Sequence, residues 1–519
     1  MKILLISVPY SNRLSNESLG IERICTYLKA QNKVVDVLYI HESDDVEKEF
    51  SKIDLNYDIF GFSPLHDNID FVSKLALLIK RSNPFSFVVF GSKYITSYYK
   101  DIVLYEKEKE ESCFDFLVLG EGEYTMLNIM NCLERNEDIK NYANQNENIA
   151  TIESIENKKA LSIDINELPV PERIYIKNKN SITAYICDSH GCVGSCSFCS
   201  SYFYHKWCGR TAKSLFDEVL SIYNNTKSRI FMFTSSSFED PGDLGKERIN
   251  KFCDKVIESK ISVSFKCYLR AETFDENDIE LLRKMKMAGF NQVYVGVESG
   301  NDEDLRLYAK RANVNDNKKM LELLNKAGIY GGEFGFIMFN PYSDLKRISS
   351  NYYFLADNNP FNMHNFVSKL IVFKGTKIYE MLQKDNMIIN KKKSSYNMIE
   401  DFHFADKEIT DLYRFVEEYI TVDSLMDAGF NSSFLMSILH NFSHLPEIEE
   451  STEEFLTIIS SNETIVKNYF YWLYVKYDIS YCKKIYDEFK FNYLDNDKKM
   501  QLLYNKLLKK LMKKNIILS

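Results

Sequence analysis

The string GCVGSCSFCS, residues 191–200, carries three closely spaced cysteines. Cys192, Cys196 and Cys199 follow the spacing C-x3-C-x2-C, and Phe198 directly precedes the third. Three thiolates this close together can bind three irons of a [4Fe–4S] cube and leave the fourth iron open. An open iron can bind a small chelating molecule and pass it one electron, so the spacing predicts a redox cofactor site.

A structural zinc site is the alternative for these cysteines. Such a site usually needs four protein ligands, and no further Cys or His follows at a finger-like distance. Cys187 and His190 lie upstream and Cys208 lies downstream, so the residue types leave a zinc knuckle open. A disulfide framework is disfavoured because the chain has 11 cysteines, an odd number, most of them scattered singly.

Length and composition set the class of protein. A chain of 519 residues predicts two or three domains. The net charge of −9 disfavours a nucleic-acid partner, and no apolar run approaches the roughly 18 residues of a membrane helix. Residues 3–8 read as a buried first strand rather than a signal peptide. Free thiols and an oxygen-sensitive cluster favour the cytoplasm.

The first part of the chain, residues 1–140, alternates strand and helix patterns. This alternation predicts a doubly wound parallel sheet, whose ligands lie outside the carboxyl ends of the strands. The strands are expected at residues 2–8, 34–39, 58–63, 87–91 and 114–120. A polar linker, residues 141–180, follows.

Residues 181–390 alternate strand and helix patterns again. They predict a full or partial parallel (β/α) barrel with function at the carboxyl ends of its strands. The strands are expected at residues 182–186, 229–233, 262–269, 292–297, 332–339 and 366–372. The cysteine string follows the first of these strands and so lies at the functional end. Residues 391–519 are rich in Tyr, Phe, Leu, Lys and Glu and predict a helical cap, with helical stretches at 452–461 and 469–477.

With this placement, residues 181–390 resemble the radical S-adenosylmethionine (SAM) enzymes. Four further strings support the resemblance in the family's order. They are CGRTAKSLFDEV (208–219), YLRAETF (268–274) leading to GVESG (296–300), GIYGGEFGFIMFNP (328–341) and FKGTKIYEML (373–382). The last string resembles a PGT element near the barrel end, with Lys374 in place of the usual proline.

The resemblance implies a set of cofactor contacts. Cys192, Cys196 and Cys199 would bind the cluster, and the SAM amine and carboxylate would chelate its fourth iron. The remaining SAM contacts would be Phe198 along the adenine, Ser236 near the amine, Arg270 on the carboxylate or an internal acid, Glu298 on ribose hydroxyls or on Arg270, and Ser299 and Met338 at the strand ends. The second strand ends in TSSSFED (234–240) rather than the family's more usual acidic form.

The first part of the chain resembles the cobalamin-binding domain that precedes the barrel in one branch of this family. The matching strings are SLGIERICTYLKAQNKVVDVLYI (18–40), VVFGSKYIT (88–96) and FLVLGEGEYTMLNIM (116–130). The loop at residues 9–18, PYSNRLSNES, lacks the D-x-H-x-x-G motif of the lower axial ligand. The expected fold is therefore α/β: a Rossmann-like cobalamin-binding-type domain (1–140), a linker (141–180), a partial barrel (181–390) and a helical C-terminal domain (391–519).

The function implied by the resemblance is reductive cleavage of SAM to a 5′-deoxyadenosyl radical, followed by cobalamin-dependent C-methylation of an unactivated carbon. The substrate would be a small molecule or a peptide, and a one-electron reductant such as flavodoxin or ferredoxin would be a partner. Two alternatives remain open. One is a radical epimerase, cyclase or rearrangement enzyme with no methyl transfer, and the other is a cluster-bearing sensor or scaffold. No residue is singled out as a general acid or base.

Overall fold

The computed structural model describes residues 1–8, 17–41, 45–179, 181, 183–200, 207–359, 362–389, 396–422, 425–426, 439 and 446–513. The chain divides into two compact units. The first unit comprises Met1–Cys187, Cys208–Ser228 and Lys391–Met398. The second unit comprises Asp188–Trp207, Arg229–Asn390 and Ile399–Ser519.

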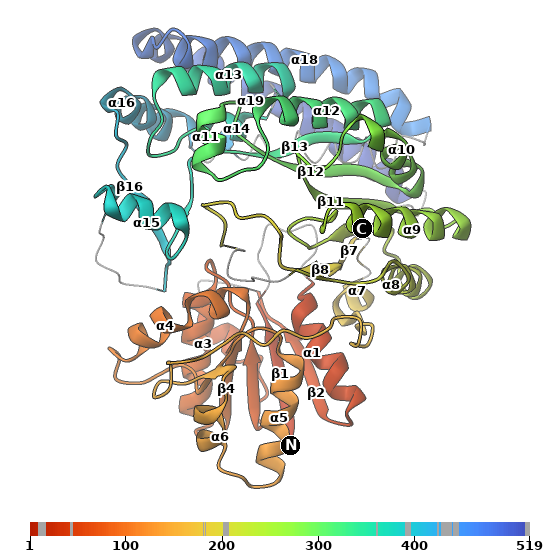
Figure 1. Ribbon diagram of the computed structural model, residues 1–519, viewed down its shortest axis with the longest axis vertical. Helices are drawn as coiled ribbons and strands as arrows, with labels where there is room; N and C mark the ends of the chain where they lie inside the picture. Colours follow the sequence, from red (N-terminus) through yellow and green to blue (C-terminus); the bar gives the residue numbers. More distant parts are fainter. Residues whose placement is uncertain are drawn as a thin grey trace. The chain divides into compact units, whose positions relative to one another are not determined.

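The first unit is built on a six-stranded sheet in the order β2-β1-β3-β4-β5-β6. The first five strands are parallel and β6 pairs antiparallel to β5 (Figure 1). The apolar side chains of the inner strands β1, β3, β4 and β5 are mostly buried, as expected for a parallel sheet covered on both faces, whereas those of the edge strand β2 are largely exposed or half-buried. The strands are β1 (Lys2–Ser7), β2 (Val34–Tyr39), β3 (Ile59–Phe62), β4 (Phe87–Gly91), β5 (Phe116–Val118) and β6 (Ile149–Ala150).

Helices connect these strands in the doubly wound manner. The strand order reverses between β1 and β3, which creates a switch point at their carboxyl ends. The helices are α1 (Leu19–Ala30), α2 (Val46–Phe50), α3 (Ile69–Ser82), α4 (Lys93–Glu106), α5 (Glu123–Glu134) and α6 (Ile139–Gln145). The first unit also contains α7 (Ile174–Lys179), β7 (Thr183–Ile186), β9 (Cys208–Gly209) and α8 (Ala212–Asn225).

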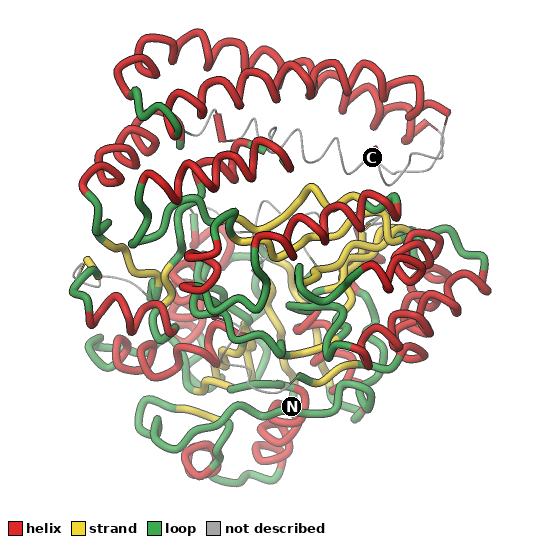
Figure 2. Tube along the Cα trace, turned by 45° about the horizontal axis from the view of Figure 1, so that its top comes forward, coloured by secondary structure: helices red, strands yellow, loops and turns green. Residues whose placement is uncertain are grey.

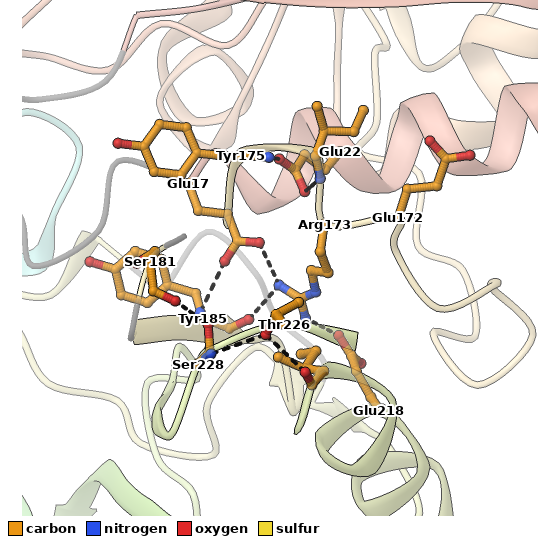
Figure 3. Close-up of polar contacts among 12 residues, drawn as sticks. Glu17, Glu22, Glu172, Arg173, Tyr175, Ser181, Tyr185, Glu218, Thr226 and Ser228 are labelled. Carbon is orange, nitrogen blue, oxygen red and sulfur yellow. Dashed lines mark hydrogen bonds and ion pairs between the residues drawn. The ribbon is translucent and has the colours of Figure 1, made fainter. Parts of the chain in front are cut away.

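The segment after β6 is fastened to the first unit by a buried ion network (Figure 3). The Arg173 guanidinium donates to Glu17 Oε1 at 2.9 Å and to the Tyr185 carbonyl at 2.7 Å. It also pairs with Glu218, which Arg210 contacts as well. Arg173, Glu17 and Glu218 are each almost fully buried. Opposite charges at contact distance compensate for the loss of water around each group.

The same segment closes over the end of β5. Gly120 forms a parallel bridge with Leu161, and the Glu121 amide donates to the Leu161 carbonyl at 2.9 Å. Gly120 has φ +83, and a Cβ there would lie 2.2 Å from the Leu161 carbonyl oxygen. Both the backbone conformation and the close approach therefore require glycine.

A later part of the chain also belongs to the first unit. Tyr396 is buried, and its hydroxyl donates to Glu106 Oε1 at 2.5 Å. The Tyr94 hydroxyl donates to the Tyr396 carbonyl at 2.5 Å. Residues 396–398 are thus anchored by side chains from α4.

The second unit contains four parallel strands in the order β13-β12-β11-β10. Stacked phenylalanines form its core: the Phe233 ring centroid lies 5.6 Å from that of Phe265 and 6.0 Å from that of Phe290. The strands are β10 (Ile230–Phe233), β11 (Ser264–Arg270), β12 (Phe290–Glu298) and β13 (Tyr330–Phe336). The helices and short elements between them are β8 (Ser189–His190), α9 (Asp243–Ser259), the 3-10 helix Glu276–Asp278, α10 (Ile279–Ala288), α11 (Asp302–Leu307), α12 (Val314–Ala327) and α13 (Leu345–Asn358).

The strand expected at residues 366–372 is reduced to a single parallel bridge, between Lys369 and Phe339. Met363–Val367 form helix α14, and β14 (Val372–Phe373) begins only at the end of the predicted run. A short buried apolar run does not distinguish strand from helix, which explains the error. β14 and β15 (Ile388–Ile389) both pair with β16 (Ile399–Phe402). Helix α15 (Lys377–Lys384) connects β14 to β15 in the sequence.

Helices dominate the rest of the second unit. α16 (Lys407–Phe415) continues into a π-helix, Val416–Ile420. α18 (Pro446–Tyr474) and α19 (Ile479–Lys513) pack side by side, as Figure 2 shows in red. Among the described helices, none is both long and apolar enough to cross a bilayer. The helical stretch expected at 452–461 lies within the single helix α18, and the stretch expected at 469–477 lies in the same helix only as far as Tyr474.

Candidate active site

The cysteine loop of the second unit is held by one serine. Ser197 donates from Oγ to the Leu307 carbonyl and from its amide to the Tyr308 carbonyl, both at 2.8 Å. The Ser197 carbonyl accepts from the Ile378 amide at 2.9 Å. Ile378 lies in the FKGTKIYEML string, so two of the strings that carried the family resemblance are directly bonded.

Acidic and basic side chains fix the beginning of the loop. The Val193 amide donates to Asp240 Oδ2 at 3.0 Å, and Arg311 donates to the Val193 carbonyl at 3.2 Å. The Gly194 amide donates to Cys192 Sγ at 3.3 Å. Backbone N–H donors of this kind stabilise a thiolate over a thiol.

All three thiols are free and partly exposed. Burial raises the pKa of Cys192, while Arg270 opposes that shift. Burial also raises the pKa of Cys196 to about 11, with Lys310 opposing it and the charges of Glu298, Cys199 and Cys192 adding to it. The three sulfurs are therefore electrostatic neighbours with two cations beside them, which suits ligands that must bind as thiolates.

In the described part of the chain, no three His, Cys, Asp or Glu side chains form a group that could hold a single metal ion. The zinc alternative for the three cysteines stays a prediction. Cys187 lies beside Arg23, whose Nη1 is 3.6 Å from the sulfur.

Phe198 points from the loop into an apolar cluster. Its ring centroid lies 5.4 Å from that of Tyr308 in an edge-to-face arrangement. The cluster also contains Ile337, Ile378 and Leu382. Phe198 is only partly buried, so part of the ring remains available to a planar ligand.

Arg270, at the end of β11, is the centre of an acidic group. It pairs with Asp240 at 2.7 Å, Glu239 at 3.3 Å and Glu272 at 3.5 Å. Glu298 is not among these partners, so its expected role in positioning Arg270 has no support in the contacts. Arg270 therefore pairs with acidic residues of this chain, which is one of its two expected roles. Its other expected role, binding the SAM carboxylate, stays a prediction.

Five buried side-chain atoms of this group have no hydrogen-bond partner among the described residues: Glu239 Oε2, Asp240 Oδ1, Glu272 Oε2, and Arg270 Nε and Nη1. Asp240 Oδ1 and Arg270 Nε take part in the ion pairs of the group, so the atoms outside those pairs are Glu239 Oε2, Glu272 Oε2 and Arg270 Nη1. A free carboxylate oxygen suits an ammonium group, and a free guanidinium nitrogen suits a carboxylate. The methionyl end of SAM carries both groups, so these residues fit the ligand that the cysteine spacing implies. Burial raises the pKa of Glu239, and Arg270 opposes the shift.

The serines at the end of β10 divide into different roles. The Ser237 hydroxyl donates to Glu239 Oε1 at 2.8 Å and the Ser235 amide donates to Asp188 Oδ1 at 3.2 Å. Ser236, the predicted amine contact, is exposed. The acceptor beside Arg270 is Glu239, three residues later, which sequence reasoning missed.

Glu298, at the end of β12, adopts a positive φ of 68. Its Oε1 lies 3.9 Å from Lys310 Nζ. Its carboxylate covers two glycines: a Cβ on Gly335 would lie 3.0 Å from Oε2, and one on Gly296 would lie 3.2 Å from Oε1. Burial raises the pKa of Glu298 and Lys310 opposes the shift.

Ser299 and Met338, the other two predicted SAM contacts, are fully buried. The Ser299 hydroxyl contacts Asn351 Oδ1 at 2.8 Å and Asp304 Oδ2 at 3.2 Å. The Met338 amide donates to the Ser368 carbonyl at 3.0 Å. These contacts are structural ones within the second unit, and the SAM-binding role of both residues stays a prediction.

Comparisons with known proteins agree with this geometry. The model of the radical SAM superfamily matches residues 186–348. A protein of Pyrococcus horikoshii named as an uncharacterized methyltransferase is 22% identical over 435 residues, which are 80% of this chain and 91% of that protein. The anaerobic magnesium-protoporphyrin IX monomethyl ester cyclase of Rubrivivax gelatinosus is 25% identical over 354 residues, 64% of this chain and 61% of that protein.

The whole fold also has a solved counterpart. The structure of the cobalamin-dependent SAM radical enzyme OxsB, with aqua-cobalamin and SAM bound, has a TM-score of 0.72 and 18% identity. The match covers 99% of this chain and 81% of that chain, so both units are included. This likeness confirms the predicted fold class. The chain therefore contains a radical SAM domain, and its overall fold resembles that of OxsB.

Proposed function

We propose that this chain is a cobalamin-dependent radical SAM enzyme that methylates an unactivated carbon of a small molecule or a peptide. The observation that carries the proposal is that Glu239 Oε2 and Arg270 Nη1, beside the cysteine loop, are buried and have no hydrogen-bond partner among the described residues. The OxsB-like fold over 99% of the chain supports the cobalamin part.

The residues of the second unit would act by binding and orientation. Cys192, Cys196 and Cys199 would hold the cluster, while Glu239 and Arg270 would orient the amine and carboxylate of SAM. When bound, these groups supply the reductive cleavage of SAM to methionine and a 5′-deoxyadenosyl radical, and cobalamin supplies a methyl group. The protein fixes the distances between the reacting parts and excludes water and oxygen.

In this proposal, cobalamin would bind at the carboxyl ends of β1, β3 and β4 of the first unit. Asn68 joins two of these ends, because its Oδ1 accepts from the Leu65 amide and its Nδ2 donates to the Val8 carbonyl, both at 2.8 Å. Ser92 caps α4 at the third, accepting from the Ile95 amide at 3.0 Å. The end of β5 is covered by residue 161. The loop at residues 9–16 lies outside the described residues.

The relatives named as cyclases favour a second candidate, a radical reaction without methyl transfer. The two functions differ in their products. Methyl transfer from SAM through cobalamin yields S-adenosylhomocysteine as well as 5′-deoxyadenosine. A cyclase, an epimerase or a rearrangement enzyme yields 5′-deoxyadenosine alone.

The test is anaerobic reconstitution of the full chain. We expect about one cube per chain, a cobalamin absorption spectrum, and both SAM-derived products after reduction. The triple variant Cys192→Ala, Cys196→Ala, Cys199→Ala should lose the cluster and both products. Cys208→Ala, in the first unit, is the matched control and should keep them.

Each other outcome contradicts a defined part of the proposal. A cluster with SAM cleavage but neither cobalamin nor S-adenosylhomocysteine would replace methyl transfer by the second candidate. A chain that binds neither cluster nor SAM would leave only a scaffold, and the proposal would be wrong.

A further inference from the structure

The turn that follows α11 bonds to two parts of the active site. The carbonyls of Leu307 and Tyr308 accept the two hydrogen bonds of Ser197 from the cysteine loop. The turn then reverses at Ala309, which has a φ of +53, and closes with the Lys310 amide donating to the Leu305 carbonyl at 2.9 Å. The backbone of this turn therefore fixes where the Lys310 side chain begins.

The Lys310 side chain runs back to the end of β12. Its ammonium donates to the Gly296 carbonyl at 2.9 Å and lies 3.9 Å from Glu298 Oε1. The side chain is only 4% exposed. A lysine is rarely buried unless it is paired, and the carboxylate of Glu298 is at the outer limit of an ion pair.

The strand is adapted to this ammonium. A Cβ at Gly296 would lie 3.2 Å from Lys310 Nζ and 3.2 Å from Glu298 Oε1. Glycine at this position leaves room for a cation and an anion side by side over the same peptide. The position of the Lys310 ammonium is thus fixed by the turn, by its hydrogen bond to the Gly296 carbonyl, and by the missing side chain of Gly296.

The electrostatic surroundings of Lys310 include the cysteine loop. Burial lowers the pKa of Lys310, but the charges of Glu298 and Cys196 outweigh burial and raise it. The turn that carries Lys310 is bonded to Ser197, the residue after Cys196, and the ammonium lies 3.9 Å from Glu298 Oε1. The fixed cation therefore lies beside a carboxylate and close to the loop whose sulfurs the cluster would use as ligands.

We propose that Lys310 is a positioning residue that raises the reduction potential of the cluster. One-electron reduction makes the cluster more negative by one charge, and a fixed buried cation nearby favours the more negative state. Groups outside the ligand set tune metal centres in this way. The inference rests on the cluster that the radical SAM domain implies and is independent of cobalamin.

The test is an anaerobic dithionite titration of the reconstituted full chain, in which the reduced cluster is followed by electron paramagnetic resonance. Lys310→Met should move the midpoint to a more negative potential. At the midpoint of the unaltered protein, the ratio of reduced to oxidised cluster should fall about tenfold, which corresponds to about 59 mV for one electron. Lys310→Arg keeps the charge and should restore most of the ratio.

Two further variants make the test specific. Glu298→Gln removes the anion that Lys310 offsets and should move the midpoint in the opposite direction. Lys319→Met is the matched control, because Lys319 pairs with Glu276 on another part of the unit and should leave the midpoint unchanged. Iron and sulfide content confirms that each variant carries a full cube.

A Lys310→Met protein with a full cube and an unchanged midpoint would overturn the inference. If that variant does not assemble a cube, an unchanged midpoint in Glu298→Gln overturns it instead. Neither readout needs turnover. An unaltered protein that has a normal cluster midpoint but makes no S-adenosylhomocysteine would count against the proposed methyl transfer alone.

Discussion

Removing the positive charge at the centre of the buried ion network of the first unit should destabilise that unit strongly. Arg173→Met keeps an apolar side chain of similar length but leaves Glu17 without its cation. Glu218 keeps a second cation, Arg210. Breaking a buried pair by removing one partner costs about 3–5 kcal/mol because an uncompensated charge remains buried. We expect a loss of about that size in the free energy of unfolding of the first unit.

The assay is native-state hydrogen exchange on the amides of β1, β3 and β4, because a chain with two units need not unfold in one transition. The matched control is Lys29→Met. Lys29 binds the same segment through Glu172 at 2.8 Å, but the two side chains are 38% and 41% exposed. An exposed pair contributes only about 0–1 kcal/mol.

The comparison of Arg173→Met with Lys29→Met tests whether burial makes the Arg173 network stronger than the exposed Lys29–Glu172 pair. If Arg173→Met lowers the protection of these amides no more than Lys29→Met does, burial does not set the strength of this network. The reasoning from exposure to energy would then be refuted.

Two further predictions concern the two units separately. Burial raises the pKa of Asp188 to about 6, with Arg248 opposing it. Because the native state holds this proton more tightly than the unfolded chain does, the contribution of Asp188 is fully present below about pH 4. It falls by about 3 kcal/mol as the pH rises to about 7. The difference in unfolding free energy between the unaltered protein and Asp188→Asn, measured by hydrogen exchange on β10–β12 at both pH values, should change by that amount, and a pH-independent difference would contradict it. In the first unit, Gly120→Ala should cost more than about 2 kcal/mol, because both φ +83 and the Leu161 backbone exclude a Cβ. Gly20→Ala, where nothing lies within 4 Å of the added Cβ in helix α1, should be neutral or stabilising when the hydrogen exchange of the first-unit amides is measured for both variants. Equal effects of the two alanines would contradict the structure.

Much of the fold follows from local sequence patterns. The strands expected at 34–39 and 87–91 have those bounds in the structure, because continuous β-branched or aromatic runs between polar segments specify buried parallel strands. The cysteine spacing is likewise a local pattern, so the loop that carries the three cysteines can be recognised from the sequence alone.

The ion-pair partners of Arg270 could not be predicted from a local sequence pattern. Glu239 and Asp240 lie some 30 residues earlier and meet Arg270 only because β10 and β11 are neighbours in the sheet. The string SFED (237–240) contains both acidic residues, but they follow three serines, and the family pattern predicts the amine contact at one of these, Ser236. Lys310 gave no signal at all, since a single lysine in a charged stretch looks like a solvated surface residue.

The helical cap shows another limit of periodicity. Helix α18 was expected as two shorter stretches because polar residues interrupt its apolar pattern. One of them, Asn462, is fully buried, and its Oδ1 accepts from Asn496 Nδ2 of α19 at 2.9 Å. The interruption is thus a buried polar pair between two helices, which only the packed structure reveals.

The three bonds of Ser197 also constrain the order of events during biosynthesis. Its hydroxyl partner is 110 residues further along the chain, and its carbonyl partner, Ile378, comes later still. Contacts of such long sequence separation form late, after the intervening segments have folded. The cysteine loop is therefore synthesised before the residues that hold it in place. A cluster can bind to a folded cysteine loop only after Ile378 has been translated.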